Sequence, residues 1–278
     1  MAYKLLDGKK LAEKILKGVK RQIKSRRLKL KLAVVLVGDN SVSQVFIRKK
    51  KEICEKVGIG FKLYQLEKNI SLQGLKNAVE KIAEEKDNSG IVIQLPLPKN
   101  FGSDSQEILN IIPPEKDIDC LSQGNLDNFY KGEPLILPPV VGAVSHFLKD
   151  YNIPIKGKNI VVIGAGRLVG QPVNKWLLDK KAMVSLVDKF TKNVPSLTKR
   201  ADIIISGVGK PGLITGEMVK SGVVVIDAGT IVEGNKLKGD INFKTVSKKA
   251  SYITPVPGGV GPLTIACLLE NLIINKKK

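Results

Sequence analysis

Short runs of β-branched residues alternate in this chain with segments of helical periodicity, and this alternation restricts the fold more than any other feature. The run from Leu32 to Val37 reads LAVVLV, which has the composition and length of a strand buried on both faces. Ser43 is the expected N-cap of the following helix, and Gly58 its end. In the first half of the chain we expect strands at residues 32–37, 61–66 and 90–95 and helices at residues 9–24, 43–56 and 72–85.

The second half repeats the alternation around a glycine-rich turn. Residues 159–163 (NIVVI) predict a strand, the segment from Gly164 to Gly170 has the pattern G-x-G-x-x-x-G, and residues 168–178 predict a helix. Three further apolar runs predict strands at residues 184–187, 203–206 and 223–226. This order is typical of a Rossmann-type sheet.

We therefore expect an α/β protein with two α/β domains and a cleft between them, the second being a Rossmann-type NAD(P)-binding domain. The N-terminal domain is predicted to span residues 1–140 and to be joined by a C-terminal helix at residues 263–278. The Rossmann domain is predicted at residues 141–262. The glycine- and proline-containing stretch at residues 124–139 is expected to be an irregular connection.

The glycine turn predicts a dinucleotide site. Glycine allows a phosphate to approach backbone N–H groups at the positive end of a helix. Asp188 follows the next strand, about 20 residues downstream, where a carboxylate can bind the ribose hydroxyls. Such an acid repels a 2′-phosphate and favours NAD, whereas the neighbouring Lys189 could pair with that phosphate in NADP. Alternatively, Asp188 only caps a turn with Thr191.

Composition narrows the classes of function. The chain has 46 Lys and Arg against 26 Asp and Glu, a net charge of +20, which suggests an anionic partner or a lysine-rich surface. With one histidine, His146, and three separated cysteines, a zinc site or a disulfide scaffold is not expected. The sequence predicts neither a signal peptide nor a membrane span.

Four segments, three in the first half and one near the end of the chain, carry residues that are awkward for a structural role. Phe46 and Lys50 lie one helical turn apart on one face. Gln94 ends a buried strand, where a polar side chain would point into the ligand crevice. Residues 116–119 (KDID) offer two acids, Asp117 and Asp119, at strand spacing. Residues 254–262 (TPVPGGVGP) form a stiff loop before the last helix.

Taken together, these motifs resemble those of the bifunctional methylenetetrahydrofolate dehydrogenase/cyclohydrolases (the FolD family) over essentially the whole chain. The matching motifs are G-D-N-x-x-S-x-x-F-x-x-x-K at residues 38–50, Q-L-P-L-P at 94–98, P-E-K-D-I-D at 114–119, G-x-G-x-x-V-G at 164–170 and I-T-P-V-P-G-G-V-G-P-L-T at 253–264. The resemblance implies oxidation of methylenetetrahydrofolate by a nicotinamide cofactor to methenyltetrahydrofolate, followed by hydrolysis to 10-formyltetrahydrofolate.

The resemblance also implies roles for individual residues. Lys50 matches the catalytic lysine, Gln94 the glutamine that holds it, and Asp119 the aspartate that binds the amino edge of the pterin. Substrate contacts are expected from Phe46, Pro257, Gly258 and Gly259. Cofactor contacts are expected from Gly164, Ala165, Gly166, Arg167, Gly170, Asp188, Lys189 and Thr230. A cytoplasmic homodimer that uses tetrahydrofolate and NADP or NAD is implied, with no nucleic-acid partner and no membrane association.

Several positions depart from the family pattern. Phe46 replaces a tyrosine, which keeps the stacking face but loses the hydroxyl. Ala165 stands where the family has an arginine used for NADP, and Asp188-Lys189 replaces a His-Ser pair. Cys120 replaces a glycine, and residues 137–140 (LPPV) replace P-C-T-P. NAD is therefore favoured. Two alternatives are an NAD-dependent dehydrogenase with weak or no cyclohydrolase activity and a non-catalytic basic nucleic-acid-binding Rossmann protein.

Overall fold

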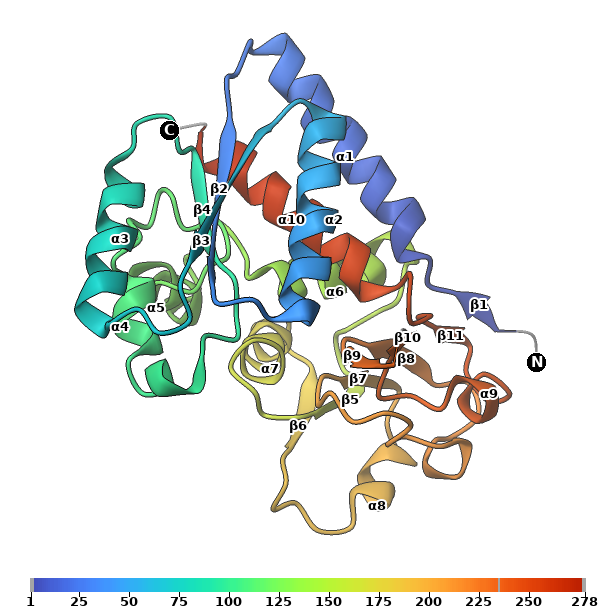
Figure 1. Cartoon of the computed structure of the whole chain (residues 1–278). Coiled ribbons are helices and arrows are strands. Elements are labelled where there is room, and N and C mark those ends of the chain that lie inside the picture. Colours follow the sequence, from blue (N-terminus) through green and yellow to red (C-terminus); the bar gives the residue numbers. More distant parts are fainter. Residues whose placement is uncertain (1–2, 235, 277–278) are drawn as a thin grey trace. The chain divides into compact units, whose positions relative to one another are not determined.

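The computed structural model describes residues 3–234 and 236–276 (Figure 1). The chain divides into two compact units. The first comprises Lys14–Pro138 and Leu268–Lys278, and the second comprises Met1–Glu13 and Pro139–Cys267. The chain passes from one unit to the other within α1 (Gly8–Ser25) and within α10 (Val260–Asn275).

These units differ from the predicted domains at residues 1–13, 139–140 and 263–267. Residues 1–13 group with the second unit because β1 (Lys4–Leu5) pairs in parallel with β11 (Tyr252–Ile253). The predicted domains were residues 1–140 joined by 263–278, and residues 141–262. Whether these segments fold as domains stays a prediction. In the described part of the chain, no helix has both the length and the apolar character needed to cross a membrane.

A three-stranded parallel sheet lies at the centre of the first unit. Its order is β3 (Gly60–Leu66), β2 (Lys31–Val37) and β4 (Gly90–Ile93). The six residues after Lys31 in β2 are all buried, as the run LAVVLV predicts. Each strand begins within one residue of its predicted start, but β4 ends two residues early, so Gln94 already lies beyond the strand.

Helices cover both faces of this sheet. Figure 1 shows α2 (Ser41–Val57) on one side and α3 (Leu72–Glu84) and α4 (Ser105–Asn110) on the other. Ala33 and Val35 of β2 share a buried cluster with Leu75 and Val79 of α3. Since alternate strand residues point to opposite faces, Leu32, Val34 and Leu36 of β2 face the α2 side.

The helix predictions need two corrections. The N-cap of α2 is Asn40, whose side chain accepts a 3.0 Å hydrogen bond from the N–H of Ser43, so Ser43 is the third helical residue and not the cap. The stretch at 124–139, predicted to be irregular, contains most of α5 (Gln123–Lys131). By contrast, Gly58 ends α2 in the left-handed conformation, as predicted.

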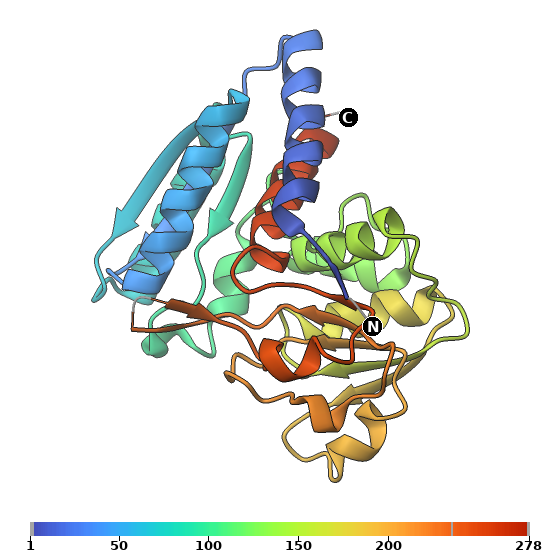
Figure 2. The same ribbon diagram turned by 90° about the vertical axis from the view of Figure 1, so that its right-hand side faces the viewer.

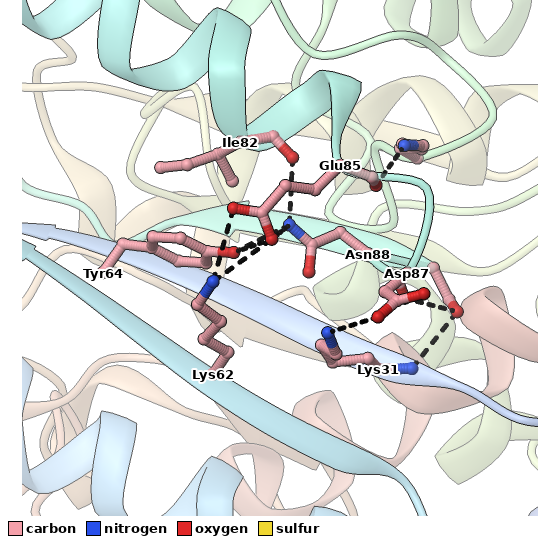
Figure 3. Close-up of polar contacts among 9 residues, drawn as sticks. Lys31, Lys62, Tyr64, Ile82, Glu85, Asp87 and Asn88 are labelled. Carbon is pink, nitrogen blue, oxygen red and sulfur yellow. Dashed lines mark hydrogen bonds and ion pairs between the residues drawn. The ribbon is translucent and has the colours of Figure 1, made fainter.

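A polar cluster beside α3 connects β3 to the segment that enters β4 (Figure 3). The hydroxyl of Tyr64 donates a 2.5 Å hydrogen bond to Glu85, and the ammonium of Lys62 lies 4.3 Å from the Tyr64 ring centroid. The buried amide of Asn88 donates to the carbonyl of Ile82 at 2.9 Å and to Tyr64 at 3.1 Å. These contacts fix the approach to β4 and therefore the position at which the chain reaches Gln94.

The second unit contains a six-stranded sheet in which all strands are parallel. Its order is β1, β11, β8 (Val224–Asp227), β7 (Ile203–Ser206), β5 (Asn159–Ile163) and β6 (Met183–Val187). The sheet confirms the predicted Rossmann-type alternation. The helices of the second unit are α6 (Pro139–Asp150), α7 (Gly170–Asp179), α8 (Val194–Thr198) and α9 (Phe243–Val246). Short 3₁₀ turns lie at Gly216–Met218 in this unit and at Lys99–Phe101 in the first unit.

The strand order reverses between β5 and β7. From β5 the chain moves outward to β6, then returns to β7 and continues to β8 and β11. In open α/β sheets, ligands bind beyond the carboxyl ends of the strands at such a reversal. Figures 1 and 2 show α7 on one face of this sheet and α8 and α9 on the other. A hairpin that the sequence did not predict, β9 (Ile231–Glu233) with β10 (Lys236–Lys238), follows β8.

Candidate active site

Lys50 and Gln94 are brought together in the first unit, as predicted. The ammonium of Lys50 donates a 2.7 Å hydrogen bond to Oε1 of Gln94. The Gln94 amide is itself oriented, because its Nε2 donates to the carbonyl oxygen of Leu95 at 2.8 Å. Its backbone N–H donates to Val35 of β2, which ties this residue to the end of the sheet. The Lys50 side chain is therefore held in place by Gln94, a buried residue whose backbone is fixed to the end of the sheet.

Burial controls the charge of Lys50. Removal from water lowers the pKa of the Lys50 ammonium, while Asp119 and Cys54 oppose that shift. Cys54 lies one helical turn after Lys50, and burial raises the pKa of its thiol to about 12. Cys54 was not among the predicted site residues, although its i+4 spacing from Lys50 places it on the same face of α2. The arrangement yields an amine that gives up its proton more readily than a surface lysine does.

The two acids of residues 116–119 have different surroundings. Asp117 is buried, and its Oδ2 accepts hydrogen bonds from the N–H groups of Leu121 and Ser122 at 2.9 and 2.8 Å. Burial raises the pKa of Asp119 to about 6, and the nearby Lys50 acts in the opposite direction. Lys116 does not pair with Asp119: its ammonium donates to two backbone carbonyls at the end of α3. Asp117 thus has a structural role, whereas Asp119 interacts electrostatically with Lys50.

Cys120 has a backbone φ of 57°, in the left-handed region that favours glycine. This conformation explains why a glycine suits the position in the family pattern. Phe46 is half-buried on α2, one turn before Lys50, as its spacing predicted.

The glycine-rich loop that precedes α10 lies in the second unit. A Cβ on Gly259 would lie 2.5 Å from the carbonyl oxygen of Pro255, and Gly258 has a φ of 110°. The carbonyl of Gly258 accepts a 3.1 Å hydrogen bond from the N–H of Lys9. The backbone path therefore requires the two glycines. Pro257, which precedes them, is exposed.

The glycine turn lies at the carboxyl end of β5, and its residues fit a dinucleotide. A Cβ on Gly170 would lie 1.6 Å from the carbonyl oxygen of Gly164, so only glycine allows this close approach of helix and turn. Gly166 is exposed, with nothing within 4 Å of a Cβ placed there. The Nε and Nη2 atoms of Arg167 are buried and have no hydrogen-bond partner among the described residues. Two buried guanidinium nitrogens without a partner beside such a turn suit a phosphate.

Asp188 follows β6 and is exposed. Its carboxylate accepts hydrogen bonds from the hydroxyl of Thr191 at 2.8 Å and from the N–H of Phe190 at 3.0 Å, and these lower its pKa. The turn with Thr191 that the sequence offered as an alternative is therefore present. The Lys189 ammonium lies 4.9 Å from the Phe190 ring centroid, and Thr230 is exposed after β8.

Comparisons with known proteins show two matching family models. Residues 6–119 match the model of the tetrahydrofolate dehydrogenase/cyclohydrolase catalytic domain, and residues 138–278 match that of the NAD(P)-binding domain of the same family.

Individual relatives match over nearly the whole chain. The bifunctional protein FolD of Caldanaerobacter subterraneus is 40% identical, over 98% of this chain and 96% of that protein. The FolD structure from Campylobacter jejuni has a TM-score of 0.93 and 40% identity, covering 99% of each chain. The Trypanosoma brucei enzyme, solved with NADP and an inhibitor, has a TM-score of 0.94 and 33% identity, over 100% of this chain and 98% of that one. The chain therefore belongs to the tetrahydrofolate dehydrogenase/cyclohydrolase family and is a bifunctional enzyme of folate one-carbon metabolism, with methylenetetrahydrofolate dehydrogenase and methenyltetrahydrofolate cyclohydrolase activities.

Proposed function

We propose that Lys50, as a neutral amine, accepts the proton of the water that attacks the one-carbon centre of methenyltetrahydrofolate. That centre is formed when the methylene carbon loses a hydride, for which the bound nicotinamide supplies the acceptor. Addition of water then breaks one of the two carbon–nitrogen bonds and gives 10-formyltetrahydrofolate with net release of one proton. The 2.7 Å bond from Lys50 to Gln94, made by an amine whose pKa burial lowers, is the observation that carries this assignment.

Gln94 is proposed to hold the amine in place, and Asp119 to bind the amino edge of the pterin. A carboxylate with a pKa of about 6 is mostly ionised at neutral pH and can accept hydrogen bonds from an amino group. Phe46 is proposed to stack on the pterin, and Pro257, Gly258 and Gly259 to contact the folate. Because Phe46 lacks a hydroxyl, we propose that the hydrolytic step is the weaker of the two.

Replacement of Lys50 by methionine tests the central assignment, since methionine retains the apolar stem. We expect Lys50→Met to lower methenyltetrahydrofolate hydrolysis by about 10²- to 10⁴-fold. Lys51→Met is the matched control, because Lys51 is exposed and paired only loosely with Glu55, at 3.9 Å. The parent rate should rise with pH as Lys50 loses its proton, and the midpoint of this rise should lie below about 10.4, the pKa of a free lysine. Unchanged hydrolysis in Lys50→Met would show that another group handles the proton.

For the cofactor, we propose NAD in preference to NADP. Ala165 brings no positive charge to the turn, and an ionised Asp188 repels a 2′-phosphate. Lys189 and Thr230 are proposed as further contacts beside the glycines of the turn. Arg167 is proposed to bind the pyrophosphate, which NAD and NADP share, because its buried Nε and Nη2 lack partners at the head of α7.

Direct binding measurements separate these assignments. Titration calorimetry should give a lower Kd for NAD than for NADP, and Arg167→Ala should raise both Kd values by about tenfold. Arg200→Ala is the matched control, since Arg200 donates to the backbone carbonyl of Ser196 at the surface. A loss confined to NADP would instead place Arg167 at the 2′-phosphate. A lower Kd for NADP than for NAD in the parent protein would remove the role given to Asp188.

We further propose that the enzyme is a cytoplasmic homodimer that supplies formyl groups for purine biosynthesis. Family membership supports this proposal, and light scattering after gel filtration tests its oligomeric part. The lysine-rich surface, with a net charge of +20, would suit the anionic tails of cellular folates.

A further inference from the structure

Two buried acids lie at or beyond the carboxyl ends of strands of the second unit, and neither was among the predicted site residues. Asp227 is the last residue of β8, and Asp240 follows the β9–β10 hairpin. Asp240 is fully buried and Asp227 is 2% exposed. Ionised groups at such depth need hydrogen-bond donors, since burial without them is costly.

The donors to Asp240 come mainly from the chain that leaves β7. Its Oδ2 accepts hydrogen bonds from the hydroxyl of Ser206 and from the N–H of Val208, each at 2.7 Å. Its Oδ1 accepts from the N–H of Lys210, also at 2.7 Å. One carboxylate thus fixes the path of residues 206–210.

Asp227 in turn fixes the backbone of Asp240. Its Oδ1 accepts from the N–H groups of Gly229 and Asp240, at 3.0 and 3.1 Å, and its Oδ2 accepts from the N–H of Ile241 at 3.0 Å. The charge of Asp240 contributes to raising the pKa of Asp227 to about 7, after burial as the main cause. The two acids therefore act in series: Asp227 holds Asp240, and Asp240 holds the loop.

Two glycines leave room for this pair. A Cβ on Gly229 would lie 2.3 Å from Cγ of Asp240, and a Cβ on Gly239 would lie 2.1 Å from Oδ2 of Asp227. Contacts below 3.0 Å are not tolerated, so the backbone is built around the carboxylates.

The loop that Asp240 holds packs directly on the glycine turn. A Cβ on Gly164 would lie 3.0 Å from the carbonyl oxygen of Gly207, and a Cβ on Gly207 would lie 2.3 Å from the side chain of Val169. These segments follow β7 and β5, the two strands between which the order of the sheet reverses. A shift of residues 206–210 would therefore change the shape of the dinucleotide turn.

We propose that Asp240 is a positioning residue for the dinucleotide: it fixes the main chain at residues 206–210, and through this loop the glycine turn from Gly164 to Gly170. Asp227 supports Asp240 by accepting a hydrogen bond from its backbone N–H. The assignment rests on the proposed cofactor site and adds to it a group that need not touch the cofactor.

Asp240→Asn tests this role, because an amide nitrogen cannot accept a hydrogen bond and one N–H of the loop would face another donor. We expect the Kd of the dinucleotide, measured by titration calorimetry, and its KM to rise about tenfold. Hydrolysis of methenyltetrahydrofolate in the absence of dinucleotide should be unchanged. Asp202→Asn is the matched control: it breaks the ion pair with Lys220 at the opposite, amino end of β7.

Ser206→Ala removes one donor and keeps the Asp240 side chain, so it provides a milder variant if Asp240→Asn does not fold. It should raise the dinucleotide Kd about threefold. An unaltered Kd in either folded variant, even with a lowered melting temperature, overturns the proposal because Asp240 would then be structural only. Failure of the proposed cofactor site itself is distinct, since the parent protein would then bind neither NAD nor NADP.

Discussion

Lys50 in the first unit and Asp240 in the second are both ionisable groups drawn out of water, yet their hydrogen-bond partners differ. The ammonium of Lys50 donates to the side chain of Gln94, and burial lowers its pKa. Asp240 receives three short hydrogen bonds, two of them from backbone N–H groups. The first arrangement makes a charge easy to discharge, which suits proton transfer. The second surrounds a carboxyl group with hydrogen-bond donors, which suits holding a backbone in one shape.

The largest expected effect comes from the backbone of the second unit. Gly170→Ala places a Cβ 1.6 Å from the carbonyl oxygen of Gly164, so the turn or α7 must move. We expect a loss of about 3 kcal/mol in unfolding free energy and about a hundredfold rise in the Kd of the dinucleotide. Chemical denaturation and calorimetry measure the two quantities.

Gly166→Ala is the matched control, four residues away in the same turn. A Cβ at Gly166 meets nothing within 4 Å, so stability should change by less than about 0.5 kcal/mol. Equal effects of the two alanines would mean that close backbone approach does not shape this site.

The next effect tests the electrostatics of the first unit. The pKa of Asp119 is about 6 in the folded protein against 3.8 for an ordinary aspartate, so the folded state favours the protonated carboxyl. Ionised Asp119 therefore destabilises the fold above about pH 6, and this cost fades as the pH falls through 6 toward 4. Asp119→Asn should stabilise the protein at pH 8 by about 1 to 3 kcal/mol and lower folate turnover by about a hundredfold.

Asp117→Asn is the control for Asp119→Asn. The carboxylate of Asp117 accepts bonds from Leu121, Ser122 and Asn125, so its replacement should cost about 1 to 3 kcal/mol at pH 8. Denaturation curves of both variants at pH 5 and pH 8 give the comparison. A loss of stability in both would place Asp119 among the structural acids.

The smallest expected effect is a change in stability caused by the backbone conformation of Cys120, in the same unit as Lys50. Cys120 is buried in a left-handed conformation, which costs about 1 kcal/mol with a Cβ present. Cys120→Gly should therefore be more stable than Cys120→Ala by about 0.5 to 1 kcal/mol. In α2 the order should be the usual one, with Cys54→Ala more stable than Cys54→Gly. The same order at both positions would contradict a strained backbone at Cys120.

Much of the fold could be predicted because buried strands have a clear local signature. The strands at 159–163 and 203–206 have their predicted bounds, since each is a short β-branched run between turn residues. The helix at Gln123–Lys131 was missed because Gly124 and the later prolines favour irregular structure. Asn40 was passed over as the N-cap because Ser43, three residues on, is an equally good capping residue.

The candidate site divides in the same way. Lys50 and Gln94 were predicted from helical spacing and from the end of a strand, both of which are local features. Asp227 and Asp240 were missed because each looks like an ordinary turn acid in the sequence. Their role depends on contacts between residues as far as 34 positions apart, from Ser206 to Asp240. Such contacts appear only once the sheet is assembled.

The pairing of β1 with β11 has a consequence for dividing the gene. A fragment that starts at Pro139 would lose β1, and its sheet would end in an uncovered β11 with free backbone groups. Exposed edges of this kind recruit other strands and promote aggregation. The complementary fragment would lack the last turns of α10. Recombination at codon 138 would therefore exchange incomplete units. A chimera that folds must keep residues 1–13 with residues 139–267, and residues 268–278 with residues 14–138.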